Sequence, residues 1–317
     1  MKTIQFHNYG SADVLTLENV DPPVPVEDEL LVDVHAAGVN PVDWRYRTGQ
    51  LRWYDWFTSF PRVPGSDLAG TVVETGSDVD QFEIGDEVFA MLDPLGSGTY
   101  AERVTVTADQ AAHVPDGITF VEAAGIPLVS LTTLQAYRDH ADLSEGEQVL
   151  VNGASGGVGT VAVQLARTKD CDVTGICSER NVELVEALGA QKVIDYNETD
   201  FTEQKRTYDV VFDTIGNRTF RAARNVLPAT GRYVTTDISL DRLMEIVGSR
   251  LWFGPTASAV VVTPSGEDLR EIADLLEEGS LRPVVDRTYP LEEAAEAHRY
   301  SESHRASGKI TLRMASG

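Results

Sequence analysis

The stretch that decides the fold is Val149-Leu-Val-Asn-Gly-Ala-Ser-Gly-Gly-Val-Gly159, an apolar run that ends in a glycine-rich turn. The residues that follow place one apolar face on a helix: Val158, Val161, Ala162, Leu165 and Ala166. A strand, a glycine turn and a helix in this order suit a pyrophosphate, because glycines let backbone N–H groups approach it and the helix dipole favours its charge. The glycines at 153, 156 and 159 depart from the strict G-x-G-x-x-G spacing, so a turn without a ligand is the alternative.

Further strand-like runs follow, and helical patterns separate most of them. The runs cover residues 172–177, 193–194, 209–213, 232–236 and 258–263. A short helix is expected over 181–188, and Gly189 suits the position just after its end. Repeated alternation of this kind predicts a doubly wound parallel sheet that binds its ligand at the carboxyl ends of the strands.

The first 120 residues or so have a different pattern, in which frequent turns separate short strand-like runs such as 30–35, 68–74 and 87–91. They predict a compact, mostly antiparallel barrel. Near the C-terminus we expect a helix that Ser265 caps and Gly279 ends, and then a last strand over 308–312. The predicted plan is a barrel domain over 1–122, a dinucleotide-binding domain over 123–263 and a return to the first domain over 264–317.

The chain has 317 residues, 42% of them hydrophobic, which suits two domains. No apolar run approaches the length of a membrane span, and the N-terminus lacks an apolar signal core. The only cysteines, Cys171 and Cys177, cannot make a disulfide framework and fit a reducing compartment. We therefore expect a cytoplasmic protein.

The charge is strongly negative, with 50 Asp and Glu against 26 Lys and Arg, a net charge of −24. The acids are dispersed, and lysine occurs only at positions 2, 169, 192, 205 and 309. Such a surface repels nucleic acid and anionic membranes. We interpret it as a halophilic adaptation, because salt screens the self-repulsion; an ordinary acidic enzyme is the alternative.

With these motifs the whole chain resembles the zinc-independent branch of the medium-chain dehydrogenase/reductase superfamily. It is similar to quinone oxidoreductases of the ζ-crystallin type and to the mitochondrial reticulon-interacting reductases. The resemblance rests on Gly38-Val-Asn-Pro-Val-Asp43, Pro64-Gly-Ser-Asp-Leu-Ala-Gly70, Gly85-Asp-Glu-Val88, Leu131-Thr132, Asn152 to Gly159 and Val193-Ile-Asp-Tyr196. It implies a GroES-like β-barrel domain joined to a Rossmann domain, and a reductase that uses NAD(P)H.

The sequence argues against zinc. Members of the superfamily with catalytic zinc carry a thiolate early in the barrel domain and a Gly-His-Glu further on. Here these positions read Gly38-Val39-Asn40 and Gly65-Ser66-Asp67. No cysteine precedes Cys171, the four-cysteine lobe of structural zinc is absent, and the histidines have no ligand spacing. We expect no metal, and we interpret Asp67 as the cap of a turn; a ligand for a hard metal ion is the alternative for this carboxylate.

The residues after the second strand of the dinucleotide domain, Cys177-Ser-Glu-Arg-Asn181, favour NADPH. Ser178 can donate to a 2′-phosphate and Arg180 can pair with it, and the resemblance adds Tyr196. An acid at the end of this strand is typical of NAD-binding proteins, so Glu179 weakens the prediction. The alternative for Arg180 is a solvated residue at a helix start.

The other residues assigned to the cofactor come from the glycine turn and from the resemblance. The turn contributes Gly153, Ser155, Gly156, Gly157, Val158 and Gly159. The resemblance implies contacts from Thr132, Thr214, Ile215, Gly216, Thr235, Gly308 and Lys309. For Thr235 the alternative is packing at a strand end.

Because nicotinamide supplies the hydride, the protein must orient the acceptor and hold charge on its oxygen. The side-chain amide of Asn40 is the predicted donor. Related enzymes often have a tyrosine five residues later, where this chain has Arg45 with Tyr46 beside it, so Tyr46 is a second catalytic candidate. Arg45 either supplies positive charge or lies on the surface.

An aromatic segment follows Asn40: Trp44, Trp53, Tyr54, Trp56, Phe57 and Phe60. It is a candidate wall for a flat apolar substrate. The alternatives are a packed loop and a dimer contact.

Together these features predict a homodimeric, NADPH-dependent reductase of quinones or α,β-unsaturated carbonyls that acts without metal. One alternative is an alkenal or enone reductase with no quinone activity. Another is a non-catalytic NADPH-binding protein. A zinc alcohol dehydrogenase is disfavoured by the missing ligands.

Overall fold

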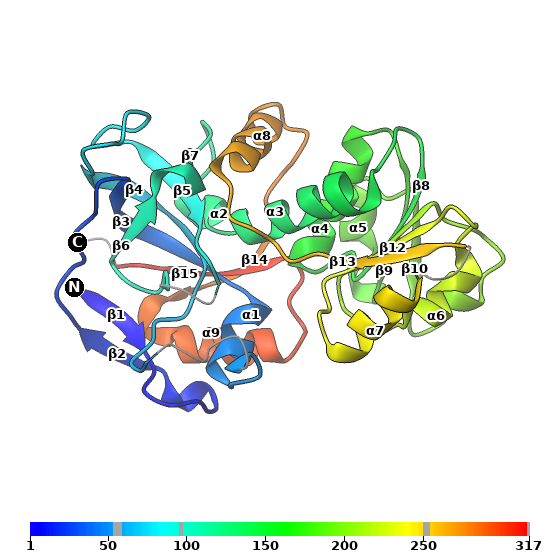
Figure 1. Ribbon diagram of the computed structural model, residues 1–317, viewed down its shortest axis with the longest axis horizontal. Coiled ribbons are helices and arrows are strands. Elements are labelled where there is room, and N and C mark those ends of the chain that lie inside the picture. The colour runs from blue at the N-terminus through cyan, green and yellow to red at the C-terminus, as the bar shows by residue number, and fades with distance from the viewer. Residues whose placement is uncertain (53–58, 95–97, 250–253, 316–317) are drawn as a thin grey trace. The chain divides into compact units, whose positions relative to one another are not determined.

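The computed structural model describes residues 1–52, 59–94, 98–249 and 254–315. The chain divides into two compact units, shown in Figure 1. The first contains Met1–Leu128 and Thr263–Gly317, and the second contains Val129–Val262. Within the described ranges, no helix is both long enough and apolar enough to cross a membrane.

The second unit is built on a parallel sheet of six strands in the order β10-β9-β8-β11-β12-β13. The strands are β8 (Gln148–Asn152), β9 (Asp172–Cys177), β10 (Lys192–Asp195), β11 (Val210–Asp213), β12 (Arg232–Thr235) and β13 (Thr256–Ala259). Strand order reverses at β8, the switch point where such sheets bind ligands. The predicted doubly wound sheet is confirmed. The sixth strand was predicted too late, at 258–263, because its pairing with β12 stops where β12 ends at Thr235.

Helices connect these strands. They are α4 (Gly157–Thr168), α5 (Val182–Ala187), α6 (Phe220–Ala223) and α7 (Leu240–Ser249), whereas α3 (Pro127–Gln135) and a π-helical turn over Ala136–Ala141 precede β8. The predicted apolar face of α4 is buried, since Val161, Ala162 and Leu165 are at most 4% exposed. The helix therefore packs on the sheet, which fixes its first turn beside the end of β8.

The first unit is built on a sheet in the order β14-β15-β3-β4-β5-β7, with β6 also paired to β3. Its strands are β3 (Glu29–Val39), β4 (Asp67–Thr75), β5 (Glu87–Met91), β6 (Arg103–Thr107), β7 (Ala111–His113), β14 (Val285–Pro290) and β15 (Lys309–Arg313), and β1 (Lys2–Gln5) pairs with β2 (Thr16–Asn19). All the neighbours in the larger sheet are antiparallel except β14 and β15. The C-terminal strand β15 thus lies beside β3, where Ile310 pairs with Val39.

Four α-helices of the first unit are α1 (Pro41–Arg47), α2 (Phe120–Ala123), α8 (Gly266–Glu277) and α9 (Ala294–Glu302). As predicted, Ser265 caps α8, its hydroxyl accepting from the Asp268 backbone N–H at 3.1 Å, and Gly279 follows the helix with φ +71°. The core between sheet and helices is apolar and includes Leu30, Leu68 and Leu312, all fully buried. Helix α1 begins directly after β3, so the sheet fixes its N-terminus.

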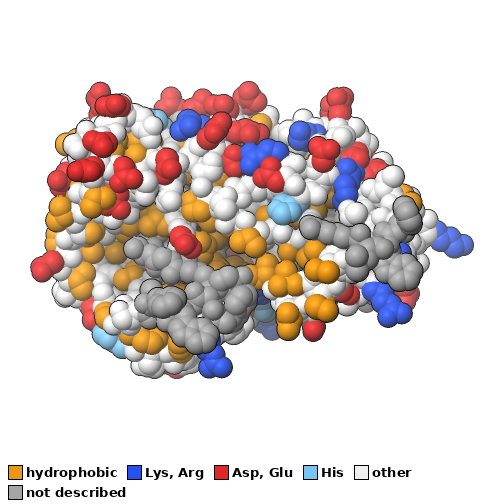
Figure 2. All heavy atoms as spheres, in the orientation of Figure 1, with side chains coloured by type: hydrophobic (Ala, Val, Ile, Leu, Met, Phe, Trp, Pro, Cys, Tyr) orange, Lys and Arg blue, Asp and Glu red, His pale blue; other side chains and the backbone are white. Residues whose placement is uncertain are grey.

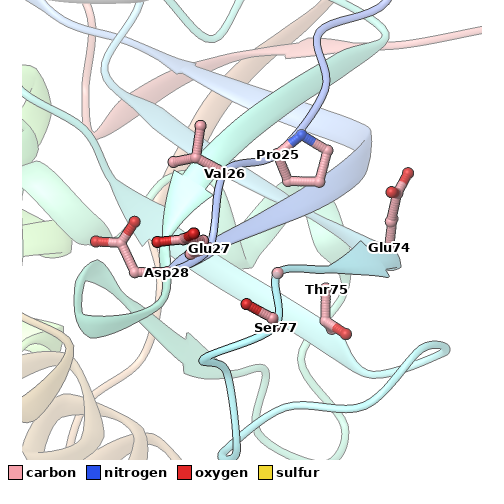
Figure 3. Close-up of a pocket in the computed structure, with 8 residues that line it drawn as sticks. Pro25, Val26, Glu27, Asp28, Glu74, Thr75 and Ser77 are labelled. Atoms are coloured by element: carbon pink, nitrogen blue, oxygen red, sulfur yellow. The ribbon is translucent and has the colours of Figure 1, made fainter.

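The surface is acidic, as the composition predicts. Figure 2 shows many Asp and Glu side chains on the visible face and fewer Lys and Arg side chains. Even the hollow shown in Figure 3, with a volume of about 560 Å³, is lined by the carboxylates of Glu27, Asp28 and Glu74. This hollow lies where β3 begins, roughly 30 Å along the eleven-residue strand from Asn40. Its charge disfavours an anionic cofactor there.

Candidate active site

The glycine turn between β8 and α4 has the backbone geometry that a phosphate requires. Gly153 has φ +88°, a conformation that favours glycine. A Cβ on Gly159 would lie 2.0 Å from the Gly153 carbonyl oxygen, so no larger residue fits. Helix α4 begins at Gly157 after the cap residue Gly156. Its first N–H groups have no partner inside the helix and are donors for an anion.

The residues predicted to select NADPH lie together at the carboxyl ends of β9 and β10. The Tyr196 backbone N–H donates to the Cys177 carbonyl oxygen at 3.1 Å, which places Tyr196 beside Ser178. The side chain of Tyr196 is 56% exposed, and Arg180 and Glu179 are exposed as well. These side chains can reach a ligand at this edge, and Glu179 stands among them.

A buried amide links this edge to the glycine turn. The Asn181 side-chain N–H donates to the Ser155 hydroxyl at 2.9 Å and lies 3.5 Å from the Ser178 hydroxyl. Asn181 is 7% exposed. It holds the two halves of the predicted cofactor site in one arrangement, and the sequence analysis missed it because its role depends on a partner 26 residues away.

Asp213 at the end of β11 organises the next loop, and the sequence analysis missed it too. Its Oδ1 accepts from the Asn152 side-chain amide at 2.8 Å and from the backbone N–H groups of Ile215 and Gly216 at 3.1 and 2.9 Å. Its Oδ2 accepts from the Tyr233 hydroxyl at 2.7 Å, and burial followed by this carboxylate raises the pKa of Tyr233 well above its usual range. The loop predicted to pass the cofactor is therefore fixed to the end of β8.

Three more residues assigned to the cofactor also have defined places. Thr214 follows β11, and its hydroxyl donates to the Asn152 carbonyl oxygen at 2.8 Å. Thr132 lies in α3 and is 5% exposed. Thr235 is fully buried, and its hydroxyl accepts from the Asp237 backbone N–H at 3.1 Å, a contact that fits the packing alternative.

In the first unit, Asn40, Asp67 and Lys309 form one group, called here the Lys309 cluster: Asn40 follows β3, and Asp67 and Lys309 are the first residues of the neighbouring strands β4 and β15. The Lys309 ammonium donates to Asn40 Oδ1 and to Asp67 Oδ2, the latter at 3.2 Å. The Asn40 amide N–H donates to Asp67 Oδ2 at 2.9 Å and lies 3.5 Å from the Ser66 hydroxyl. The exposed fractions of Asn40, Asp67 and Lys309 are 1%, 0% and 5%. The cluster is a buried ion pair bridged by an amide.

The surrounding backbone is shaped for this cluster. A Cβ on Gly38 would lie 2.7 Å from Asp67 Oδ2 and 2.5 Å from the Ala124 carbonyl oxygen, so glycine is needed beside the carboxylate. Asp67 Oδ1 accepts from the Leu128 backbone N–H at 2.8 Å. The interpretation of Asp67 as a turn cap was therefore wrong, because Asp67 is the buried first residue of β4 and its carboxylate accepts from the Leu128 backbone N–H and from the Lys309 ammonium.

The donor set of the cluster does not suit zinc. It offers one carboxylate, one amide and one hydroxyl, and the Lys309 ammonium already donates to the carboxylate and to the amide oxygen. A second cation at these oxygens would meet that positive charge. Among the described residues no group of three or more His, Cys, Asp or Glu could hold a metal ion. The absence of zinc stays a prediction.

A second buried group adjoins the start of α1. Asp43 Oδ2 accepts from the Asn40 backbone N–H at 2.7 Å and from the Tyr100 hydroxyl at 3.1 Å. The Tyr100 hydroxyl lies 3.2 Å from His298 Nε2. Burial raises the pKa of Asp43 to about 7, whereas burial and then the charge of Arg47 lower the pKa of His298 to about 3. Both groups are therefore neutral in mildly acidic solution.

Comparisons with known proteins agree with this architecture. The family model described as "Alcohol dehydrogenase GroES-like domain" matches residues 26–116, and the one described as "Zinc-binding dehydrogenase" matches residues 188–312. The mouse protein "NAD(P)H oxidoreductase RTN4IP1, mitochondrial" is 34% identical over 345 aligned positions, which cover 96% of this chain and 87% of the relative. The chain belongs to the quinone oxidoreductase branch of the medium-chain dehydrogenases/reductases.

Other members of this family match over almost the whole chain. The Arabidopsis thaliana protein "NADPH-dependent alkenal/one oxidoreductase, chloroplastic" is 34% identical over 98% of this chain and 79% of its own length. The quinone oxidoreductase structure from Coxiella burnetii has a TM-score of 0.91 and 32% identity, with 99% of each chain covered. The Escherichia coli quinone oxidoreductase, described as complexed with NADPH, has a TM-score of 0.84 and 27% identity, with 99% of this chain and 100% of that chain covered.

In this quinone oxidoreductase-like chain, Tyr46 is not placed with Asn40. It lies in the last turn of α1, roughly 9 Å along the helix. Tyr46 is 2% exposed, its ring contacts that of Phe6 at 5.8 Å edge to face, and Arg62 lies over it at 5.1 Å. Burial raises its pKa, so it is a poor proton donor at neutral pH. Arg45 is half-buried, with its guanidinium 5.4 Å from the Trp44 ring centre.

The aromatic segment is placed only in part. Trp53, Tyr54, Trp56 and Phe57 lie outside the described residues. Trp44 is 8% exposed and meets His304 edge to face at 5.9 Å, and Phe60 packs against the rings of Phe6 and Tyr9 at 5.8 and 5.2 Å. The described members therefore have packing partners, and the substrate wall stays a prediction.

Proposed function

We propose that this protein is an NADPH-dependent reductase that transfers a hydride to a quinone or an α,β-unsaturated carbonyl without a metal. The observation that carries the proposal is the free helix N-terminus at the glycine turn, with Ser178, Arg180 and Tyr196 at the same sheet edge. Relatives with the names quinone oxidoreductase and alkenal/one oxidoreductase support the two acceptor classes.

The dihydronicotinamide, when bound, supplies the hydride. The N–H groups at the start of α4 hold the pyrophosphate, and the glycines at 153 and 159 leave room for it. Arg180 pairs with the 2′-phosphate, and the Ser178 and Tyr196 hydroxyls donate to it. The exposed carboxylate of Glu179 repels this phosphate. NADPH is therefore favoured over NADH only to the extent that the attraction between Arg180 and the phosphate exceeds this repulsion.

Asn40 belongs to the acceptor side of the reaction in this proposal. Its amide N–H already donates a hydrogen bond to Asp67 and lies close to the Ser66 hydroxyl. Its contribution is therefore to hold the Lys309 cluster in place at the end of β3. Tyr46 stays a weaker candidate, because it is buried among aromatic rings.

The experiment is an acceptor screen with purified protein. NADPH consumption is followed at 340 nm with a set of quinones and a set of alkenals and enones, each also with NADH. We expect turnover with at least one acceptor and a preference for NADPH. Turnover with enones alone would support the alternative, an enone reductase without quinone activity. Binding of NADPH with no consumption for any acceptor would mean a non-catalytic NADPH-binding protein.

We also propose that the protein is a homodimer joined through the second unit. Strand β13 ends the sheet, so one of its edges has no partner strand among the described residues. Helix α7 beside it leaves four apolar side chains exposed on one face: Leu240 at 75%, Leu243 at 41%, Met244 at 67% and Val247 at 59%. Sedimentation equilibrium at molar salt should give twice the chain mass of 34.6 kDa, and Met244→Glu should shift it towards one chain.

A further inference from the structure

We propose that the Lys309 ammonium donates a hydrogen bond to the acceptor oxygen of the substrate and stabilises the negative charge that hydride transfer creates there. This inference rests on the proposed reduction of a quinone or enone, and it names the residue of the first unit that touches the reacting group. The sequence resemblance assigned Lys309 to the cofactor instead.

The first support is the hydrogen-bonding capacity of the ammonium. A lysine has three N–H donors. Two of them are used, by Asn40 Oδ1 and by Asp67 Oδ2, and the third has no acceptor among the residues that the structure describes. Lys309 is 5% exposed, so it is almost dehydrated yet still reaches a surface. A buried cation with one unused donor can bind one oxygen atom.

The second support is the position of the neighbouring amide. Asn40 is 1% exposed, and its amide N–H groups face Asp67 and Ser66 at 2.9 and 3.5 Å. It therefore has less donor capacity for a substrate than Lys309 has. A charged donor also makes a stronger bond to an oxyanion than a neutral amide does. Asn40 and Asp67 are thus positioning residues that fix the ammonium.

The third support is that neighbouring groups hold the carboxylate of the cluster in place. Asp67 is fully buried, and its two oxygens accept from the Leu128 backbone N–H at 2.8 Å and from the Asn40 amide N–H at 2.9 Å. Donors that are fixed in advance near low-dielectric surroundings stabilise developing charge most effectively. By the resemblance, the two segments that carry zinc ligands in zinc-dependent members here contribute Asn40 and Asp67, and Lys309 supplies a positive charge beside them.

The chemical step balances with these groups. For an enone, the hydride of NADPH forms a C–H bond at the β-carbon, and the π electrons of the C=C bond shift to leave an enolate oxygen beside Lys309. NADPH is oxidised to NADP⁺ and the enone is reduced. Lys309 keeps its proton throughout, and a proton from water completes the carbonyl product.

The test separates the effect of losing the positive charge from the effect of destabilising the fold. Lys309→Gln alone would leave Asp67 buried without its partner, which destabilises the protein. The double variant Lys309→Gln/Asp67→Asn removes both charges and keeps the polar contacts. We expect its kcat to fall by roughly 10²–10³-fold, the cost of losing one oxyanion donor, while the Kd for NADPH changes by less than about threefold. Lys169→Gln, at an exposed lysine of the second unit, is the matched control and should keep wild-type kcat.

A rescue experiment supplies a readout that a structural role would not move. Lys309→Ala/Asp67→Asn, which leaves no buried carboxylate without a partner, should lose turnover, and ethylammonium or propylammonium ions should restore part of it in a saturable manner, whereas tetramethylammonium should not. Full turnover in the double variant, or NADPH affinity that falls in parallel with kcat, would overturn the role of Lys309. Absence of acceptor-dependent NADPH consumption in the wild-type protein would instead overturn the proposed function, and this inference with it.

Discussion

The glycine turn between β8 and α4 and the Lys309 cluster, which we propose bind the cofactor phosphates and the acceptor, are built to stabilise negative charge in opposite ways. The turn uses backbone N–H groups at the start of a twelve-residue helix and contains no charged side chain of its own. The cluster buries a complete ion pair and depends on three side chains that are far apart in the sequence. A backbone site is sensitive to volume at its glycines, whereas the cluster is sensitive to single polar atoms.

The largest expected effect comes from volume in the turn. In Gly159→Ala the new Cβ would lie 2.0 Å from the Gly153 carbonyl oxygen, so the turn must open and NADPH affinity should fall at least 100-fold. Gly248→Ala, in helix α7 and away from the turn, is the control, because its Cβ would meet nothing within 4 Å. Fluorescence titration with NADPH compares the two. Equal affinities in both variants would contradict a close backbone approach at Gly159.

The next effect concerns pH and the two neutral groups near α1. The raised pKa of Asp43 gives stability that is present at low pH and is lost as pH rises from 3.8 to about 7. The lowered pKa of His298 gives stability that is present above pH 6.5 and is lost as pH falls towards 3. Between about pH 4 and 6.5 the folded and unfolded states therefore bind the same number of protons at this pair, and its net contribution is flat.

Single variants should reveal the two opposite dependences of folding stability on pH. Relative to wild type, Asp43→Asn should lose stability as pH falls from 6.5 to 4, and His298→Gln should gain it, each by at most about 1.4 kcal/mol per pH unit. Urea unfolding at several pH values measures both, and the difference from wild type removes the contribution of the other carboxylates. Parallel curves for the two variants would show that the groups are not neutral in the folded state.

A smaller effect is expected at the ribose phosphate. Arg180→Ala removes a charge-assisted contact, so NADPH binding should weaken by roughly 1–3 kcal/mol while NADH binding changes little. Arg221→Ala, at an exposed arginine of α6, is the control for the loss of one positive charge. Should both cofactors lose the same affinity, Arg180 would not contact the 2′-phosphate.

The smallest change is expected from salt. The net charge of −24 is dispersed, and its self-repulsion should weaken as the Debye length falls from about 30 Å at 0.01 M to about 3 Å at 1 M. The melting temperature should therefore rise by several degrees along a potassium chloride series. A melting temperature that is constant or falls would contradict the halophilic interpretation.

The two regions also differ in how far the sequence predicts them. The glycine turn, the doubly wound parallel sheet and the grouping of Ser178 with Arg180 follow from local patterns, because each is built by neighbours along the chain. The boundary of β13 was missed, since it depends on the length of β12 rather than on its own apolar residues.

The Lys309 cluster was only partly predicted, because its members are far apart in sequence. Asn40 and Lys309 were named singly, and Asp67 was interpreted as a turn cap. Only the pairing of β15 and β4 with β3 brings the three together. The sequence did hold one usable signal for Asp43, its place three residues after Asn40 at the start of a helix, which is the spacing of a capping box.

The most direct measurement compares NADPH affinity and acceptor turnover in two variants side by side. Gly159→Ala should lose NADPH binding, with turnover recovering as NADPH concentration is raised. Lys309→Gln/Asp67→Asn should bind NADPH within about threefold of wild type and yet turn over roughly 10²–10³-fold more slowly at saturating cofactor. If the two variants instead lost affinity and turnover in the same proportion, the division between a cofactor-binding turn and an acceptor-binding cluster would be contradicted.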